Sequence, residues 1–181
     1  MKLLVSVLVL TSFCVNATFE WGSCPKVTLQ ADFDLSKYLG NWFELIRNKD
    51  MKYEKGECSK ADYSMNSDGT VRVFNSETRD GQWTSIEGYA YCDSNNPAHC
   101  YVKFSKFAPA GDYQVVSTDY ESYSLVFSCF SIGIAHWKWA WLLARDVNLD
   151  VSPFVSAIES FGIPASGLHY TQQTNCPASF Y

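Results

Sequence analysis

Basic residues are scarce and scattered in this 181-residue chain, which has 14 Lys and Arg against 19 Asp and Glu and a net charge of −5. No stretch is rich in Lys or Arg, so nucleic acid and anionic membranes are not expected as main partners, since both need concentrated positive charge. Charged residues make up only 18% of the chain and aromatic residues 16%, a composition that excludes a largely disordered protein. No linker, low-complexity tract or repeat divides the chain, and one compact domain is expected.

Long apolar runs are missing except at the N-terminus, where about 13 apolar residues follow Lys2, fewer than the roughly 20 that span a bilayer. A basic residue, a short apolar core and the small residues of Val15-Asn16-Ala17 are typical of a secretory signal peptide. We therefore expect residues 1–17 to be removed and residues 18–181 to form a secreted, extracellular domain with no integral membrane segment.

Cleavage after Ala17 would remove Cys14 and leave six cysteines. Outside the cell six cysteines are expected to form three disulfides, and the sequence alone allows fifteen pairings. No spacing of His, Cys and Asp resembles a metal site, so no metal is expected. No Ser-His-Asp grouping, phosphate-binding loop or carboxylate pair stands out either, so we expect no catalytic residues and a protein that is not an enzyme.

The apolar pattern predicts an all-β fold. Runs rich in Val, Tyr, Phe, Trp, Ile and Thr recur every eight to twelve residues and are separated by Gly, Asp, Asn, Ser or Pro. They predict strands at 41–47, 58–65, 70–76, 84–92, 99–105, 113–118, 124–128 and 136–144. Ser67-Asp68-Gly69 and Arg79-Asp80-Gly81 each supply the glycine that a tight hairpin needs. Eight such strands predict an antiparallel barrel or sandwich.

One helix is expected near the C-terminus. Ser152 is the expected N-cap, Pro153 suits the first turn, and Gly162-Ile163-Pro164 ends the helix. Apolar residues repeat at helical spacing between them, at Phe154, Val155, Ile158 and Phe161. The helix is therefore amphipathic and should pack on the outside of the strands, and a last short strand is expected at 168–172.

Three separated motifs resemble the lipocalin family: Gly40-Asn41-Trp42 with its Gly-x-Trp pattern, Thr118-Asp119-Tyr120 before the seventh strand, and Leu143-Ala144-Arg145 at the end of the eighth. From about residue 24 to residue 176 the chain is most similar to the apolipoprotein D subgroup. The resemblance implies an eight-stranded antiparallel up-and-down barrel with one C-terminal α-helix packed outside and a small apolar molecule in a central cup. It implies structural roles for Gly40, Trp42, Thr118, Asp119, Tyr120 and Arg145, with the Arg145 guanidinium over the Trp42 indole at the closed end.

The same resemblance implies the disulfides. It pairs Cys24 with Cys129 and Cys58 with Cys176, which leaves Cys92 and Cys100 for each other. The few catalytic lipocalins resemble thiol enzymes with a free cysteine in the cup, and this pairing leaves none.

Side chains alternate along a strand, so one inward residue sets the facing of its neighbours. If Arg145 points into the base of the barrel, the inward residues of the eighth strand form an aromatic wall of Trp137, Trp139, Trp141 and Leu143, and the outward ones are Lys138, Ala140 and Leu142. From Trp42, the same alternation turns Glu44 and Ile46 inward. The resemblance adds Tyr63, Asn75, Arg79 and Phe104 to the expected ligand-binding residues, with Gly88 leaving space in the cup.

We expect the ligand's polar end to be oriented by Tyr63, Asn75, Arg79 and Glu44. Arg79 would pair with a carboxylate and so favour a fatty acid or a bilin over a neutral steroid. Alternatively, Arg79 is solvated at the hairpin tip beside Asp80-Gly81, and the sequence leaves both possibilities open.

We therefore predict a secreted lipocalin that binds and transports a small hydrophobic ligand, such as a fatty acid or a sterol, and needs no cofactor. One alternative is a chromophore-binding protein that holds a bilin or a carotenoid for coloration or photoprotection. Another is a protein whose outer surface serves defence or adhesion. Nothing in the sequence identifies a protein receptor.

Overall fold

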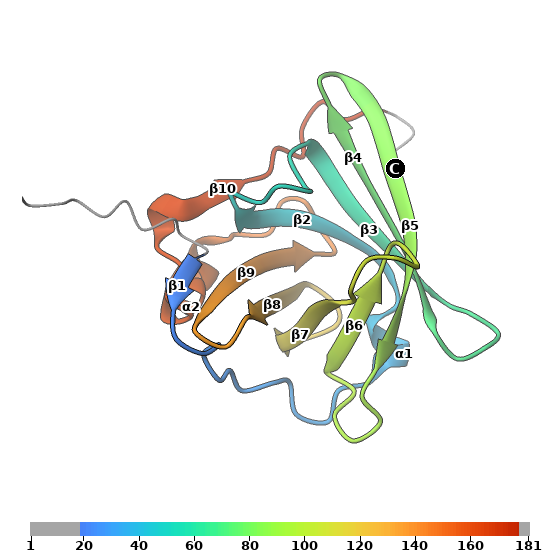
Figure 1. Cartoon of the computed structure of the whole chain (residues 1–181). Coiled ribbons are helices and arrows are strands. Elements are labelled where there is room, and N and C mark those ends of the chain that lie inside the picture. The colour runs from blue at the N-terminus through green and yellow to red at the C-terminus, as the bar shows by residue number, and fades with distance from the viewer. Residues whose placement is uncertain (1–18, 178–181) are drawn as a thin grey trace, which may run out of the picture.

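The protein forms a closed barrel of eight antiparallel strands (Figure 1). The structure is a computed structural model that describes residues 19–177, so the expected signal peptide lies outside the described residues. Each barrel strand, β2 to β9, pairs with the next along the chain, and β2 also pairs with β9 to close the barrel. Two short strands extend the sheet, β1 beside β9 and β10 beside β2. The predicted all-β, eight-stranded up-and-down barrel is confirmed.

The strands are β1 Phe19–Trp21, β2 Gly40–Asn48, β3 Glu57–Met65, β4 Val71–Arg79, β5 Gln82–Cys92, β6 His99–Lys103, β7 Gly111–Thr118, β8 Tyr123–Ser131, β9 Ala135–Ala144 and β10 Leu168–Tyr170. The helices are α1 Leu35–Tyr38, α2 Ser152–Ser160 and the 3-10 turn η1 Ala165–Gly167. All eight predicted barrel strands occur, and β4 and β8 run three residues beyond their predicted C-terminal ends. Within residues 19–177, no helix is long and apolar enough to cross a membrane.

Strand β2 contains a β-bulge that the sequence did not reveal. Glu44 lies opposite Leu143, but Ile46 lies opposite Leu142, so Leu45 is one extra residue in β2. Such a bulge reverses the facing of the residues that follow it. Glu44 faces inward as expected, whereas Ile46 lies on the outer face among the residues beneath α2. The expectation that Ile46 faces inward is therefore wrong.

Helix α2 packs on the outside of the barrel, as predicted. Ile158 is fully buried, and its cluster includes Ile46 of β2 and Leu142 of β9. The expected N-cap is wrong, because Ser152 is the first helical residue and not the residue before the helix. The carboxylate of Asp150 instead accepts the Ser152 backbone N–H at 3.0 Å.

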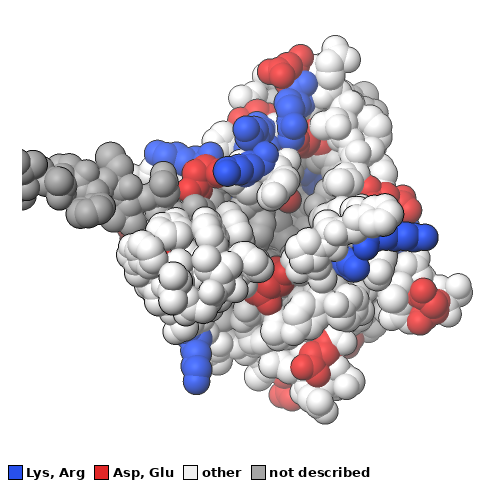
Figure 2. Space-filling view, viewed as in Figure 1, with Lys and Arg blue, Asp and Glu red and all other residues white. Residues whose placement is uncertain are grey.

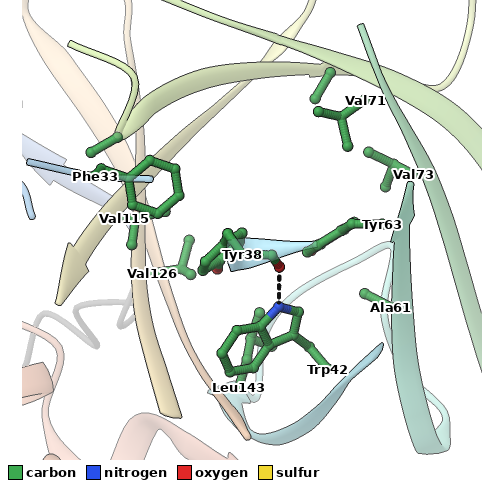
Figure 3. Packing of buried hydrophobic residues seen from close by; sticks show 12 residues of the cluster. Phe33, Tyr38, Trp42, Ala61, Tyr63, Val71, Val73, Val115, Val126 and Leu143 are labelled. Carbon is green, nitrogen blue, oxygen red and sulfur yellow. Dashed lines mark hydrogen bonds between the residues drawn. The ribbon is translucent and has the colours of Figure 1, made fainter. Parts of the chain in front are cut away.

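The closed end of the barrel is packed around Trp42, which is fully buried. The guanidinium carbon of Arg145 lies 3.7 Å from the centroid of the Trp42 ring. The indole N–H donates to the backbone oxygen of Tyr38 at 2.8 Å (Figure 3). Gly40 has a φ of 93°, and a Cβ there would lie 3.3 Å from Arg145 Nη1. Glycine at this position therefore leaves room for the guanidinium.

The turn between β7 and β8 is held by its own side chains. Thr118 Oγ1 donates to the backbone oxygen of Tyr123 at 2.6 Å and accepts the N–H of Tyr120 at 2.9 Å. The Asp119 carboxylate accepts the backbone N–H groups of the three residues from 121 to 123. The backbone oxygen of Tyr120 accepts from Arg145 Nε at 3.1 Å. This turn is thus tied directly to the closed end.

Three disulfides tie both ends of the described chain and one hairpin to the barrel. Two are the pairs that the resemblance implied, and the third joins the two cysteines that this pairing left over. Cys24–Cys129 joins the segment after β1 to β8, and Cys58–Cys176 joins β3 to the C-terminal segment. Cys92–Cys100 joins β5 to β6. All six cysteines in the described part of the chain are paired.

Candidate ligand-binding cup

One wall of the barrel interior consists of tryptophans from β9. The register of β9 with β8 places Trp137, Trp139 and Trp141 on the inner face, opposite Phe130, Ser128 and Val126 respectively. Each of these tryptophans is partly exposed. The alternating residues of β9 are buried on the outer face, at Lys138, Ala140 and Leu142. These rings are therefore partly accessible to solvent on the inner face of the barrel, which we call the cup.

The opposite wall, built by β4 and β5, is also open. Ile86 of β5 lies opposite Asn75 of β4 on the inner face and is 50% exposed. Strand β5 pairs with β6 only from Tyr89 to Cys92, so residues 82–88 have a strand partner on the β4 side alone (Figure 1). An apolar side chain that is half exposed on the inner face of a barrel is available to a ligand.

The space expected at Gly88 is already filled. A Cβ on Gly88 would lie 2.3 Å from the backbone oxygen of Lys103 and 2.7 Å from Cδ1 of Phe104. Glycine is therefore needed here because β6 approaches closely. The ring of Phe104 therefore covers Gly88. Because Phe104 is 39% exposed, the ring also remains accessible at the wall.

The floor of the cup is a cluster of tyrosines, of which Figure 3 shows Tyr38 and Tyr63. Tyr38 stacks on Tyr63 with 6.0 Å between ring centroids, and the hydroxyl of Tyr113 lies 2.9 Å from that of Tyr38 and 3.3 Å from that of Tyr63. Burial raises the pKa of Tyr38 to about 12 and raises the pKa values of Tyr63 and Tyr113 as well. Leu143 is 6% exposed and belongs to the same cluster. Tyr63 and Leu143 therefore form the floor and not the open wall.

Arg47 is a buried cation on the inner face that the sequence reasoning missed. The bulge in β2 places it opposite Trp141, and it is 4% exposed. Nη1 donates to Glu44 Oε1 and to Thr171 Oγ1, each at 2.9 Å. Nε donates to the backbone oxygen of Glu54 at 3.0 Å, and Nη2 donates to that of residue 56 at 3.2 Å. Every nitrogen of this guanidinium therefore has an acceptor.

Two carboxylates surround that one guanidinium. Glu54, in the segment between β2 and β3, accepts the indole N–H of Trp141 through Oε2 at 2.7 Å. Burial, followed by the nearby Glu54 carboxylate, raises the pKa of Glu44 to about 8 against the opposing effect of Arg47. Burial also raises the pKa of Glu54, against the opposing hydrogen bond from Trp141. The segment carrying Glu54 is thereby fixed to the wall of the cup.

Arg79 lies near the mouth and is already engaged. Its Nη2 donates to a carboxylate oxygen of Glu77 and to the backbone oxygen of Tyr53 at 3.0 Å. The other oxygen of Glu77 accepts the N–H of Gly56 at 2.9 Å and that of Lys55 at 3.2 Å. Arg79 and Glu77 thus hold the segment 49–56 against β4. Arg79 is exposed at the end of β4, which agrees with the alternative of a solvated residue at the hairpin, while its Nη2 is held by Glu77 and Tyr53.

Asn75 supplies an unpaired polar atom. Its register partners, Ala61 and Ile86, place it on the inner face between the floor and the mouth. Its Oδ1 is buried and has no hydrogen-bond partner among the residues that the structure describes. A buried oxygen without a partner is costly.

Charge is unevenly spread over the face seen in Figure 2. Lys and Arg side chains gather with acidic ones over the ends of β3 and β4, while the surface over β1 and the start of β9 is largely uncharged. The exposed apolar residues of that uncharged region are Trp21, Phe130, Ile132 and Ile134.

Comparison with known proteins agrees with this barrel. Residues 33–173 match the family model of the lipocalin-like domain. Apolipoprotein D of Bos taurus is 40% identical over 167 residues, which cover 89% of this chain and 88% of that protein. Apolipoprotein D of Cavia porcellus is 38% identical over 184 residues, covering 98% and 97%. Insecticyanin of the tobacco hornworm Manduca sexta has a TM-score of 0.75 at 25% identity, covering 87% of this chain and 90% of insecticyanin.

The chain therefore belongs to the lipocalin family. Within that family it is related to apolipoprotein D.

Proposed function

We propose that this protein binds and transports a small hydrophobic molecule in the cup. The observation that carries this proposal is the apolar surface left exposed inside the barrel, on Ile86, Phe104 and the three tryptophans of β9. Burying such surface contributes about 25 cal/mol per Å². A concave aromatic site with few polar groups is typical of small-molecule sites, and membership of the lipocalin family supports the same function.

The ligand would lie with its apolar body against Trp137, Trp139, Trp141 and Phe104. Its polar end would lie near Asn75, which is on the inner face between the floor and the mouth. Tyr63 and Leu143 would limit its depth, since both are packed in the floor.

We further propose that the protein works outside the cell as a binding protein and not as an enzyme. Three disulfides support an oxidising compartment. The pairing of all six described cysteines supports binding over thiol chemistry in the cup.

A matched pair of variants on β5 tests the cup. Ile86→Trp places a large ring inside the cup. Ser85→Trp places the same ring at the neighbouring exposed residue, on the outer face of β5. With the neutral apolar probe N-phenyl-1-naphthylamine, whose fluorescence rises in apolar surroundings, Ile86→Trp should lower the affinity by about tenfold and Ser85→Trp should leave it unchanged. Equal effects of the two variants, or no probe uptake by the unmodified protein, would refute binding in the cup.

A bilin or carotenoid chromophore is the second candidate ligand. The row of tryptophans favours it, because flat indole rings stack well on a conjugated π-system. A visible absorption band in protein purified from its own source would favour the chromophore. A colourless protein that carries an apolar molecule would favour lipid transport.

A further inference from the structure

We propose that this protein forms a symmetric dimer in which one edge of β5 pairs with the same edge of a second copy. This free edge consists of residues 82–88, which have a strand partner on the β4 side alone. The two edges run antiparallel in the dimer and join the two barrels through one continuous sheet. The proposal goes beyond the proposed function, because it concerns a protein partner and holds whether or not the cup carries a ligand.

The free edge is exposed on both faces of the strand. Six consecutive residues, from 82 to 87, are exposed, whereas no other strand in the described chain has more than two exposed residues in a row. Trp83 on the outer face is 49% exposed and Ile86 on the inner face is 50% exposed. A strand in this position presents backbone donors and acceptors that can pair with another strand.

The free edge lacks the features that usually prevent such pairing. Edge strands are commonly protected by lysine, by proline or by a β-bulge. Residues 82–88 contain no lysine and no proline, and the register between β4 and β5 has no bulge. The one charged side chain, Glu87, forms an ion pair with Arg72 at 2.6 Å. The strand pair is therefore regular up to the hairpin, and its open side can accept a further strand.

The free edge is complementary to itself. Its middle residue is Ser85, and the antiparallel self-pairing that uses all seven residues places Ser85 opposite its own copy. On the outer face, Trp83 then lies opposite Glu87 of the second copy. The two Glu87 carboxylates are thereby kept about 13 Å apart along the strands. On the inner face, Thr84 lies opposite Ile86 of the second copy and covers its exposed side chain.

The same register brings opposite charges together at both ends of the free edge. Beyond residue 88, β6 occupies this side of β5, with Lys103 opposite Tyr89. The hairpin tip of the second copy, which carries the exposed Asp80, continues past residue 82 and meets this end of β6. Lys106 is exposed just beyond it. Asp80 of each copy therefore lies near Lys103 and Lys106 of the other.

This charge match favours a second copy over a strand of another protein, because a strand of unrelated sequence need not supply it. Two-fold pairing also occupies the free edge of both copies, so the assembly ends at two chains and does not continue into a fibre.

Sedimentation velocity measures the association. We expect the unmodified protein to change from monomer to dimer between about 1 and 200 μM. Ser85→Lys places two like charges directly opposite each other and should raise the dissociation constant by about fivefold or more. Ser156→Lys makes the same substitution at an exposed position of α2 and should leave the dissociation constant unchanged. Urea unfolding checks that both variants are folded.

Cross-linking tests the register. Directly opposed residues of an antiparallel pair have Cα atoms about 4.5 to 5.5 Å apart, which a disulfide can bridge. Ser85→Cys should therefore form a disulfide-linked dimer under mild oxidation, since the six native cysteines of the described chain are already paired. Thr84→Cys introduces the same thiol one residue away, on the inner face, where its own copy is not opposite. It should stay largely uncross-linked.

Three outcomes would overturn the proposal. The first is a protein that stays monomeric at about 200 μM. The second is a dimer that Ser85→Lys and Ser156→Lys affect equally, since the two copies would then meet elsewhere. The third is cross-linking of Thr84→Cys as readily as Ser85→Cys, which would exclude this register. Because the association is measured without ligand, the dimer and the carrier function can fail separately.

Discussion

The guanidinium of Arg145 lies over the indole of Trp42, with 3.7 Å between the guanidinium carbon and the ring centroid. The same guanidinium donates to five backbone oxygens, four of them from residues 37–41 before and at the start of β2. One side chain from the end of β9 thus closes the barrel and satisfies the carbonyl groups at the end of α1.

Removing this guanidinium should destabilise the barrel. Arg145→Met keeps an apolar stem but loses the ring contact and the hydrogen bonds, and we expect a loss of about 2 to 4 kcal/mol in the free energy of unfolding. Urea unfolding followed by tryptophan fluorescence measures it. The control, Lys106→Met at an exposed loop position, should change stability by about 0.5 kcal/mol or less. An equal effect of the two variants would contradict the structural role of Arg145.

Two isoleucines should separate stability from binding. Ile158 of α2 is fully buried outside the barrel, and Ile86 is 50% exposed inside it. Ile158→Ala should cost about 2 to 4 kcal/mol of stability and leave probe affinity unchanged. Ile86→Ala should lower the free energy of unfolding by about 1 kcal/mol or less and should weaken the binding of the probe. Urea unfolding and probe titration on both variants test this. Weaker probe binding by folded Ile158→Ala would contradict a binding site inside the barrel.

The stability that each disulfide contributes should increase with the length of the chain segment that it closes. Cys58–Cys176 has a sequence separation of 118 and Cys92–Cys100 one of 8. In the chain-entropy model, losing the first costs about 5 kcal/mol and losing the second about 2.5 kcal/mol. Replacing both cysteines of each pair with serine and comparing the urea midpoints tests this order. A larger loss for the short loop would show that native-state contacts, and not loop closure, dominate.

The free energy of unfolding should fall as the pH rises above about 5, because the pKa of Glu44 is raised in the folded protein. Burial and the Glu54 carboxylate raise its pKa to about 8 from its ordinary value of 4.5. Between these values the folded protein keeps a proton that the unfolded chain has released, so the free energy of unfolding decreases by up to about 1.4 kcal/mol per pH unit. Glu44 faces Arg47 on its own strand, Glu54 on the segment after it, and Thr171 after β10.

Glu44→Gln should flatten this dependence, since glutamine does not titrate. The test is a series of urea midpoints between about pH 5 and 8 for the unmodified protein, Glu44→Gln and the control Glu121→Gln. If the slope persists in Glu44→Gln, another group holds the proton.

The sequence predicted most where a strand is regular. On β9 the alternation from Arg145 correctly gave the facing of Trp137, Trp139 and Trp141, because the register of β9 with β8 is continuous. On β2 the same reasoning worked as far as Glu44 and then failed, because the bulge at Leu45 comes from tertiary pairing and leaves no mark in the apolar pattern. Arg47 was missed for that reason.

Two features of the cup depend on contacts between segments far apart in the sequence. Arg79 was expected either to pair with a ligand carboxylate or to be solvated, and the sequence did not predict its contacts with Glu77 and with the segment after β2. Glu54 lies in an irregular segment with no period that would predict its direction, and only the contact with Trp141 places it at the cup. The position of Glu54 beside the cup could therefore not be predicted from the sequence.

Native mass spectrometry of the protein purified from its own source, with an absorption spectrum of the same sample, tests the central claim most directly. We expect one bound molecule per protein, with the mass of an apolar compound. Protein that is purified without a bound molecule and then binds no N-phenyl-1-naphthylamine would contradict the claim that the cup is a carrier site.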